Sequence, residues 1–210
     1  VKIKIAIQGE LGAYSHIAVE KLYQDAEIKT CSTFEDTFKQ AYNDPSYKII
    51  IPIENSLAGR VADIHYLLPK YKLQIHGEYF LPVVHNLLGK QDSTIKDIKY
   101  VRSHAQAISQ CQKIIANKNF QPIISVDTAG SAKDLSEGKD KTIAAIASDL
   151  SAKMYNLKIL QKNIEDDKDN VTRFLIMGKN IEQPEYDENK RYITSCIFRV
   201  KSEPSALYKC

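Results

Sequence analysis

The sequence contains little arginine and no cluster of basic residues. Only five of its 29 basic residues are arginine, and the formal net charge is +3. Domains that bind nucleic acids usually carry a pronounced basic patch or stripe. Because no Lys/Arg block is present, the positive charge is interpreted as solvated lysine, and a nucleic-acid groove is disfavoured.

Long apolar segments are also missing. The longest, such as Lys48–Ile53, are far shorter than the roughly 20 residues that a membrane helix needs. The first residues alternate like a strand and are too short for a signal peptide. The cysteines lie far apart without a Cys-x-x-Cys pair, which disfavours a zinc site or a disulfide scaffold; they are Cys31, Cys111, Cys196 and Cys210. We therefore predict no membrane association and a reducing, cytoplasmic location.

Several motifs of common enzymes and cofactor sites are absent as well. The sequence has no Gly-x-Ser-x-Gly elbow and no Walker loop, and Gly9-x-x-Gly12 is too short for a dinucleotide fingerprint. Its five histidines are scattered without metal-ligand spacing; they are His16, His65, His76, His85 and His104. We predict neither a metal nor an organic cofactor.

What is present is the composition of a globular protein, with 43% apolar and 26% charged residues in a chain of 210. This length suits one large domain or two lobes. Strand-like and helix-like stretches alternate, which predicts an α/β fold with a parallel or mixed sheet covered by helices. The predicted strands are Lys2–Ile7, Lys48–Ile53, Leu73–Tyr79, Val83–Leu88, Lys99–Arg102, Pro122–Val126, Thr142–Ala147 and Arg173–Met177.

Three helical faces lie between these strands. One contains Phe34, Phe38 and Ala41 behind a predicted Ser32–Glu35 capping box. The second contains Leu57, Val61, Ile64 and Leu68 and predicts a helix that begins near Ser56; the third contains Ala107, Cys111 and Ile114.

Small polar residues occur where predicted strands pass into helices: Tyr14-Ser15, Asn55-Ser56, Ser103, Asp127-Thr128 and Ser148. Each can be explained as an N-cap, because these side chains satisfy free backbone N–H groups. Taken together they also suit a crevice at the carboxyl ends of the strands, where helix N-termini favour a small anion such as a carboxylate.

The stretch Asn170–Phe174 stands out within this pattern. Its Thr172-Arg173 pair lies between an acidic, flexible-looking run at 165–169 and the apolar segment 174–177. A hydroxyl beside a guanidinium at the mouth of a strand offers a hydrogen-bond donor together with an anion anchor.

The last part of the sequence has a different character. Residues 181–191 are interpreted as a polar linker, and residues 192–200 alternate like a strand. Pro204 suits the first turn of a helix. One strand and part of a helix cannot bury a core, so we interpret residues 192–210 as the start of a truncated domain.

Several segments, in order over about residues 1–178, resemble the prephenate dehydratase family. They are Gly9-x-x-Gly12-Ala13-Tyr14-Ser15-His16, Pro52-Ile53-Glu54-Asn55-Ser56-x-x-Gly59-x-Val61, His85-Asn86-Leu87-Leu88, Ser103-His104-x-Gln106 with Gln110-Cys111, Asp127–Ala132, Ala144–Ser148 and Asn170-x-Thr172-Arg173-Phe174. Residues 194–208 are similar to the beginning of the phenylalanine-sensing ACT domain that commonly follows. Ala105 departs from the family pattern, which usually has proline there.

The resemblance implies a reaction and a fold. Prephenate would lose its ring carboxylate as CO2 and its C4 hydroxyl as water, giving phenylpyruvate in phenylalanine biosynthesis. Aromatisation drives the reaction, so it needs preorganised hydrogen-bond donors and no cofactor. The implied fold is two-lobed and similar to type II periplasmic binding proteins, with a cleft between the lobes. A homodimer or a higher homo-oligomer is implied too.

The implied domain boundaries are as follows. The catalytic domain would span residues 1–180, with lobe 1 at about 1–77 and 161–180 and lobe 2 at about 78–160. Hinges would lie near Gly77–Leu81 and Leu160–Asp169. L-phenylalanine would act as an allosteric inhibitor only with a full ACT domain, so we expect the 210-residue chain to be insensitive to it.

The resemblance also implies roles for individual residues. Thr172 would donate a hydrogen bond to the departing hydroxyl. Arg173 should point away from Thr172 by strand alternation, which favours a structural ion pair over a substrate carboxylate. Glu54 would be structural, because a carboxylate repels a dianionic substrate. The other candidate substrate contacts are Asn55 and Ser56 at a helix start, His85, Ser103, Gln106, Gln110 and Thr128, each with a capping or packing alternative.

Three other functions stay open. A solute-binding protein of the same fold would bind a small anion without chemistry. The sister enzyme that acts on arogenate would accept an amino group where prephenate has a keto group. A purely regulatory sensor is the third.

Overall fold

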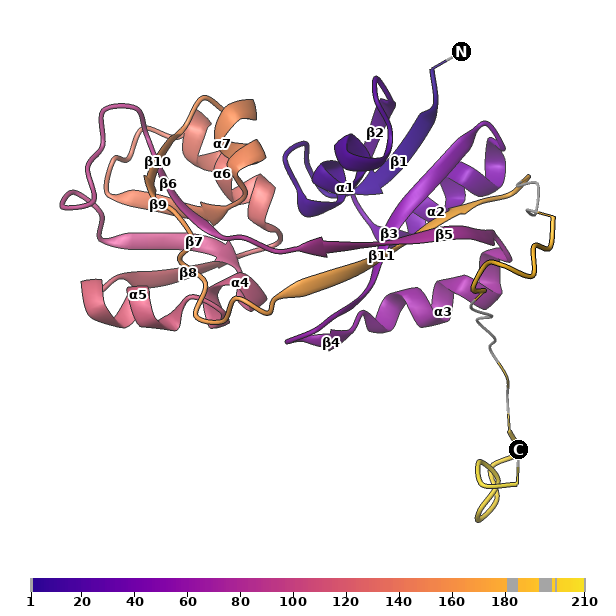
Figure 1. Cartoon of the computed structure of the whole chain (residues 1–210). Helices are drawn as coiled ribbons and strands as arrows, with labels where there is room; N and C mark the ends of the chain where they lie inside the picture. Colours follow the sequence, from indigo (N-terminus) through magenta and orange to yellow (C-terminus); the bar gives the residue numbers. More distant parts are fainter. Residues whose placement is uncertain (1, 181–184, 193–197, 199, 210) are drawn as a thin grey trace.

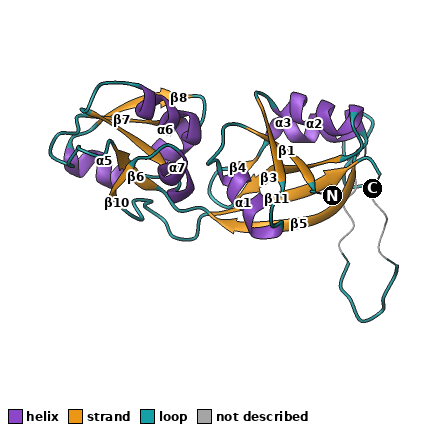
Figure 2. Cartoon of the chain, turned by 90° about the horizontal axis from the view of Figure 1, so that it is seen from above, coloured by secondary structure: helices purple, strands orange, loops and turns teal. Residues whose placement is uncertain are grey.

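The chain folds into two α/β lobes joined by two crossovers, as a computed structural model shows (Figure 1). The structure describes residues 2–180, 185–192, 198 and 200–209. Each lobe contains one mixed sheet with helices on both faces, and Figure 2 shows the lobes side by side from above. The predicted two-lobed α/β fold is confirmed.

The first sheet has the strand order β2-β1-β3-β11-β5, and β4 pairs with β3. Strands β1, β2 and β3 are parallel, whereas β11 runs antiparallel to both β3 and β5. The bounds of the strands are β1 (Lys4–Gln8), β2 (Glu27–Cys31), β3 (Tyr47–Asn55), β4 (Gly59–Arg60), β5 (Gln74–Pro82) and β11 (Val171–Gly178). The last strand of the described ranges, β11, therefore lies inside the first sheet.

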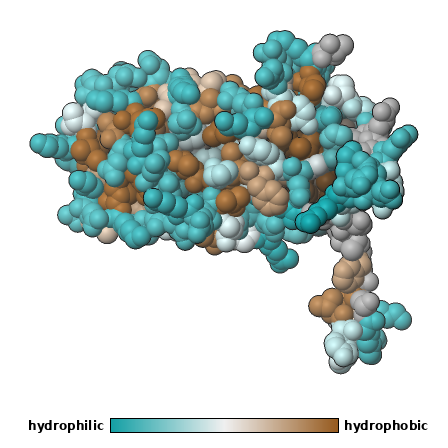
Figure 3. Space-filling model, in the orientation of Figure 1, coloured by the Kyte–Doolittle hydropathy of each residue, from teal (hydrophilic) through white to brown (hydrophobic). Residues whose placement is uncertain are grey.

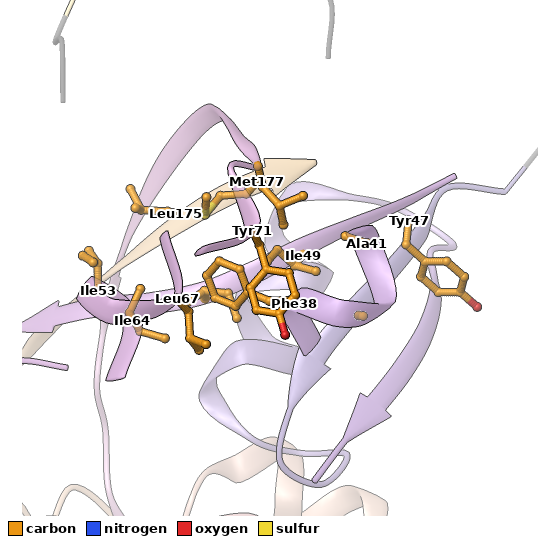
Figure 4. Close-up of a cluster of buried hydrophobic side chains, with 13 residues drawn as sticks. Phe38, Ala41, Tyr47, Ile49, Ile53, Ile64, Leu67, Tyr71, Leu175 and Met177 are labelled. Carbon is orange, nitrogen blue, oxygen red and sulfur yellow. The ribbon is translucent and has the colours of Figure 1, made fainter. Parts of the chain in front are cut away.

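Both faces of the first sheet are apolar. Helix α1 (Tyr14–Leu22) packs its Ala18 and Val19 against one face, which includes Phe174 of β11. Helices α2 (Phe34–Asn43) and α3 (Ala62–Tyr71) cover the other face, and their buried side chains pack against those of β3 and β11 in Figure 4. Burying one large side chain of this kind stabilises the fold by about 1.5–3 kcal/mol.

The second sheet has the order β10-β6-β9-β7-β8. Its strands are β6 (Asn86–Gly89), β7 (Tyr100–His104), β8 (Gln121–Ser125), β9 (Ile143–Ala147) and β10 (Lys158–Gln161). Its helices are α4 (Ala105–Ser109) and α5 (Gln112–Lys118), which share one core cluster, and α6 (Thr128–Glu137) and α7 (Asp149–Met154), which share another.

The crossovers are shorter and later in the chain than the predicted hinges. All of β5 belongs to the first sheet, so the first crossover comprises residues 83–85 and not Gly77–Leu81. The reason is that β5 pairs with β11 along its whole length, from Gln74 to Pro82. The second crossover runs from residue 162 to residue 170, close to the predicted segment.

Two local predictions in the first lobe are wrong. The cap of α2 is Thr33 and not Ser32: Thr33 Oγ1 accepts a hydrogen bond from the N–H of Asp36 at 3.0 Å and donates to its carboxylate at 2.8 Å. No helix begins near Ser56, because the chain first turns back at Gly59, whose φ is +78°, to pair β4 with β3. Helix α3 starts only at Ala62.

The sequence does not predict the strands β2, β4 and β10. Strands β2 and β4 are short or largely exposed, so they show little alternation. The predicted Val83–Leu88 strand corresponds to β6, which starts only at Asn86. The predicted strand at 192–200 lies mostly outside the described residues. Around Pro204, residues 204–209 form turns where a helix is predicted.

In the view of Figure 3 hydrophilic residues form most of the outline of both lobes. None of the helices in the described ranges is long and apolar enough to cross a membrane.

Candidate active site

A crevice of about 270 Å³ lies where the two lobes meet the second crossover. Its first wall is the turn after β3, with Leu57 and Ala58, and its second wall is helix α4 and the residue after it. The full lining is Leu57, Ala58, Gln106, Ser109, Gln110, Asp166 and Asp167. Both lobes and a crossover therefore contribute to it, so its shape depends on how the lobes are held.

Thr172 is hydrogen-bonded to Asn55, whose side chain also meets the N–H groups of Leu57 and Ala58 in the first wall of the crevice. Thr172 and Asn55 are opposite each other in the pairing of β11 with β3, and each is 8% exposed. Asn55 Nδ2 donates to Thr172 Oγ1 at 3.0 Å. A hydroxyl has one proton. Because Thr172 Oγ1 accepts this bond, its own O–H remains available to donate elsewhere.

Arg173 points to the opposite face of the sheet, as the alternation predicts. Its guanidinium donates to Glu78 Oε2 at 2.7 Å through Nε and to Glu54 Oε1 at 3.1 Å. It also lies 5.7 Å from the ring centre of Phe80. The ion pair preferred for Arg173 is thus present, and it gives Glu54 the structural partner that the sequence analysis expects.

His85 is buried in the first crossover and joins the two lobes. Its Nδ1 lies 2.7 Å from the hydroxyl of Tyr14 in the first lobe, and its Nε2 lies 2.9 Å from Gln110 Oε1 in the second. Burial lowers the pKa of His85, although the hydrogen bond to Gln110 and the charge of Glu165 oppose this shift. The ring is therefore neutral near pH 7, with one nitrogen that donates and one that accepts.

The acidic run at 165–169 is anchored to the lobes. Glu165 accepts a hydrogen bond from the N–H of His85 at 2.9 Å. Asp166 accepts from the N–H groups of Gln112 and Lys113 at 2.7 and 3.1 Å, at the start of α5. These contacts give the carboxylates of Glu165 and Asp166 partners in the first crossover and in α5.

The sequence model of the family described as prephenate dehydratase matches residues 5–182. The chain belongs to the prephenate dehydratase family.

Relatives and a solved structure of this family agree with the match. The chain is 38% identical to a bifunctional N-acyl-homoserine lactone acylase/prephenate dehydratase from Komagataeibacter europaeus, over 98% of this chain and 73% of that protein. It is 36% identical to the chloroplastic arogenate dehydratase/prephenate dehydratase 2 of Arabidopsis thaliana, over 99% of this chain and 54% of that protein. The chain thus spans about half the length of this plant relative.

A crystal structure of the prephenate dehydratase of Arthrobacter aurescens in complex with L-Phe has the same fold. Its TM-score is 0.80 at 26% identity, and the superposition covers 88% of this chain and 63% of that one. The two-lobed arrangement is therefore that of a prephenate dehydratase.

Ser56 and Ser103 do not lie at helix starts, where the sequence predicts them. Ser56 does not start a helix; its hydroxyl donates to Asp169 O at 2.7 Å and accepts from Val171 N at 2.9 Å, which ties the turn to the second crossover. Ser103 is not a helix start either. It lies inside β7, fully buried, and its hydroxyl donates to Ile146 O at 2.7 Å, so its polar group is directed to a neighbouring strand.

Gln106, Gln110 and Thr128 lie in the second lobe, in or directly after its helices. Gln106 and Gln110 line the crevice, and Gln106 Nε2 is 3.3 Å from Asn55 Oδ1. Thr128 is the first residue of α6, and Asp127 is its cap. Substrate contact by these three residues, and by Asn55, Ser56, His85, Ser103 and Arg173, stays a prediction. Across the described ranges, no group of three or more His, Cys, Asp or Glu could hold a metal ion.

A second contact between the lobes has no counterpart in the sequence analysis. The carbonyl oxygen of Gly12 accepts hydrogen bonds from Ser148 Oγ at 2.6 Å and from Ser151 Oγ at 2.9 Å. Tyr155 donates to Leu11 O at 2.8 Å, and burial raises the pKa of Tyr155 to about 12. The one sequence signal for this contact is Gly12 itself, whose φ of +91° favours glycine.

Proposed function

We propose that the chain catalyses the conversion of prephenate to phenylpyruvate, with the hydroxyl of Thr172 as the donor to the departing C4 hydroxyl. The observation that supports this role best is the direction of the Asn55–Thr172 hydrogen bond. Since Asn55 donates, the proton of Thr172 is free for the substrate. A fixed donor of this kind stabilises charge that develops on a leaving oxygen.

The reaction is a coupled bond cleavage. The bond between the ring and its carboxylate breaks and releases CO2, and the electron pair enters the ring as the C4–O bond breaks. The leaving oxygen takes up one proton and departs as water. The step needs no oxidant, so a hydrogen-bond donor and firm binding of the dianion are sufficient.

For the carboxylates of the substrate we propose amide donors and not Arg173. The guanidinium of Arg173 is already paired with Glu54 and Glu78 on the other face of the sheet. Gln110 lines the crevice, and its Nε2 has no hydrogen-bond partner within the part of the chain that the structure describes. An amide N–H directed at an anion adds affinity without a buried cation.

The test follows phenylpyruvate formation from prephenate by the purified chain, its Thr172→Val variant and its Thr172→Ser variant. Valine keeps the shape and removes the hydroxyl, so we expect kcat to fall by about 100-fold or more, the contribution typical of a positioned proton donor. Serine keeps the hydroxyl and should retain most of the rate. Near-normal kcat in a folded Thr172→Val variant would refute the assignment.

The same experiment separates two alternatives. Arogenate offered to the wild type tests the sister reaction, because the A. thaliana relative carries both activities in its name. If prephenate binds without turnover and arogenate does likewise, the chain is a solute-binding protein of this fold. We favour prephenate, and the ratio of the two kcat/KM values decides between the substrates.

Amide hydrolysis, the further activity named for the K. europaeus relative, gains no support from the histidine contacts. The ring of His85 meets Tyr14 and Gln110, and the ring of His16 meets a backbone N–H. A serine or cysteine nucleophile needs a base within hydrogen-bond reach. The dimer, the cytoplasmic location and the phenylalanine response stay predictions.

A further inference from the structure

Two backbone groups fix the orientation of the Asn55 amide. The N–H groups of Leu57 and Ala58 lie 3.1 and 2.9 Å from Asn55 Oδ1. A backbone N–H can only donate, so the atom that it meets must be the oxygen and not the nitrogen of the amide. The other end of the side chain is therefore Nδ2, with two protons to donate. One proton is directed to Thr172 Oγ1 and the other to Asn170 Oδ1, at 3.0 and 2.7 Å.

The same reasoning identifies the oxygen and nitrogen ends of the amides of Asn170 and Gln110. Asn170 is fully buried, and its oxygen already accepts from Asn55. Its Nδ2 must therefore face Gln110, which it meets at 3.0 Å, and the acceptor there is Gln110 Oε1. Gln110 Nε2 is then the end of the side chain without a partner among the described residues, and Gln110 lines the crevice.

The chain of bonds ends at His85 and Tyr14. Gln110 Oε1 also lies 2.9 Å from His85 Nε2, and an amide oxygen can only accept, so Nε2 carries the proton of the neutral ring. Nδ1 is then an acceptor and takes its hydrogen bond from the Tyr14 hydroxyl at 2.7 Å. Val84 O, 2.8 Å from the same hydroxyl, competes for that proton.

We propose that Asn170 is a positioning residue that sets the orientation of Asn55 and Gln110, so that Thr172 O–H and Gln110 N–H both present protons to one anionic ligand. Asn170 itself is buried and is not a substrate contact. The orientation of the amides is a property of the free protein. Only the effect on turnover rests on the proposed function.

The first test is the tautomer of His85 in the wild type without substrate, read from the nitrogen NMR shifts of its ring. The signal is assigned by its loss in His85→Gln. We expect a protonated Nε2 and an unprotonated Nδ1 near neutral pH. A ring that is protonated on Nδ1 alone would overturn the proposal, because Gln110 would then have to present its oxygen to the crevice.

The second test is Asn170→Asp. A carboxylate can still accept from Asn55, so Thr172 stays oriented, but it cannot donate to Gln110 Oε1. Gln110 must turn its amide over, which leaves His85 Nε2 without its acceptor and presents an oxygen to the ligand. We expect KM for prephenate to rise about tenfold or more while kcat changes much less, since a hydrogen bond to a charged group contributes about this factor.

Asn117→Asp makes the same change of charge on the exposed face of α5 and should leave KM and the His85 shifts unchanged. If Asn170→Asp does not fold, the wild-type tautomer still decides the orientation. Unchanged KM and unchanged His85 shifts in a folded Asn170→Asp variant would refute the positioning role. If the wild type binds prephenate without converting it, the dissociation constant replaces KM, and only the proposed function fails.

Discussion

Two of the contacts between the lobes, at Gly12 and at Asn55, are built in opposite ways. At Gly12, a backbone carbonyl of the first lobe is held by two serine hydroxyls of the second, with no space between them. At Asn55, side-chain amides link the lobes around an open crevice. The contact at Gly12 fixes the distance between the two lobes at that point. The amide contacts at Asn55 leave side-chain N–H groups free to donate to a ligand.

This difference separates stability from activity. The Gly12 contact holds the lobes together through groups that are not proposed donors, so its loss should act on folding free energy. The Asn55 contact orients the proposed donors, so its loss should act on rate and substrate affinity. The predictions below test the Gly12 side, and the Thr172 and Asn170 variants test the other.

Among the single substitutions, the largest effect is expected for Gly12→Ala. A Cβ at this position would lie 2.7 Å from Ser151 Oγ and 2.8 Å from Ser151 Cα, and the φ of +91° is strained for any other residue. We expect a loss of about 3 kcal/mol in unfolding free energy, from backbone strain and overpacking together. Chemical denaturation measures it.

Gly59→Ala is the matched control, because Gly59 also has a positive φ of +78° but has nothing within 4 Å of its Cβ position. Gly59→Ala should reduce the unfolding free energy by only about 1–2 kcal/mol, from the backbone conformation alone. Equal losses in the two variants would mean that the close approach to Ser151 contributes nothing.

A smaller effect is expected for the serines. Ser151→Ala removes one donor to Gly12 O and should reduce the unfolding free energy by about 1 kcal/mol. Ser148→Ala should cost about 2 kcal/mol, because Ser148 also caps α7 by accepting from the N–H of Ser151.

The double serine variant should lose more than the sum of the two single losses. Each single variant leaves Gly12 O with one serine donor, whereas the double variant leaves this carbonyl without either, which adds a desolvation penalty. A double-mutant cycle by denaturation measures the excess. Simple additivity would show that water replaces the hydroxyls.

Acidification should weaken the same contact through His16. Its Nδ1 accepts the N–H of Gly12 at 2.9 Å, and burial lowers the pKa of His16 while Glu20 opposes the shift. The unfolded chain therefore binds a proton more readily. This contribution to stability is present above the unfolded pKa of about 6.5, and it is lost as the pH falls from there through the lower pKa of the folded state.

Thermal unfolding at neutral and mildly acidic pH compares the wild type with His16→Gln and with His65→Gln at an exposed position. His16→Gln should lose less Tm on acidification than the wild type, whereas His65→Gln should behave like the wild type. Part of the dependence should survive in His16→Gln, because burial also lowers the pKa values of His85 and His76.

The smallest effect is expected for the ion pair between Lys133 and Glu10, which also bridges the lobes. The two side chains are 40% and 39% exposed, and their charged atoms are 3.1 Å apart. Lys133→Met should change the unfolding free energy by less than about 0.5 kcal/mol, because solvent and salt screen exposed pairs. A larger change that persists in high salt would contradict this.

The sequence could predict the site where local geometry decides it. Strand alternation is a property of the backbone, so it correctly separates Thr172 from Arg173. The sequence could not predict the partners that meet across lobes, such as Gly12 with Ser148. No local pattern encodes a contact between residues that are 136 positions apart.

Errors of the sequence analysis arose where one residue type suits several structures. Ser32 and Thr33 both suit a helix cap, and the backbone selects Thr33. Ser56 suits a helix start, but the turn at Gly59 uses the same segment for a strand pair. The partners of Glu165 and Asp166 could not be predicted, because they are backbone N–H groups and every residue type except proline carries one.

The position of β11 also has a consequence for how the protein is made. This strand is the last that the structure describes, yet it lies between β3 and β5. During synthesis both neighbours keep an open edge until the second lobe has been completed, and unpaired edges favour aggregation. Thr172 arrives on that closing strand, 117 residues after Asn55. A nascent chain therefore gains the proposed proton donor in the same step that completes the first sheet. Conversion of substrate is then expected only from chains in which β11 has paired with its neighbours.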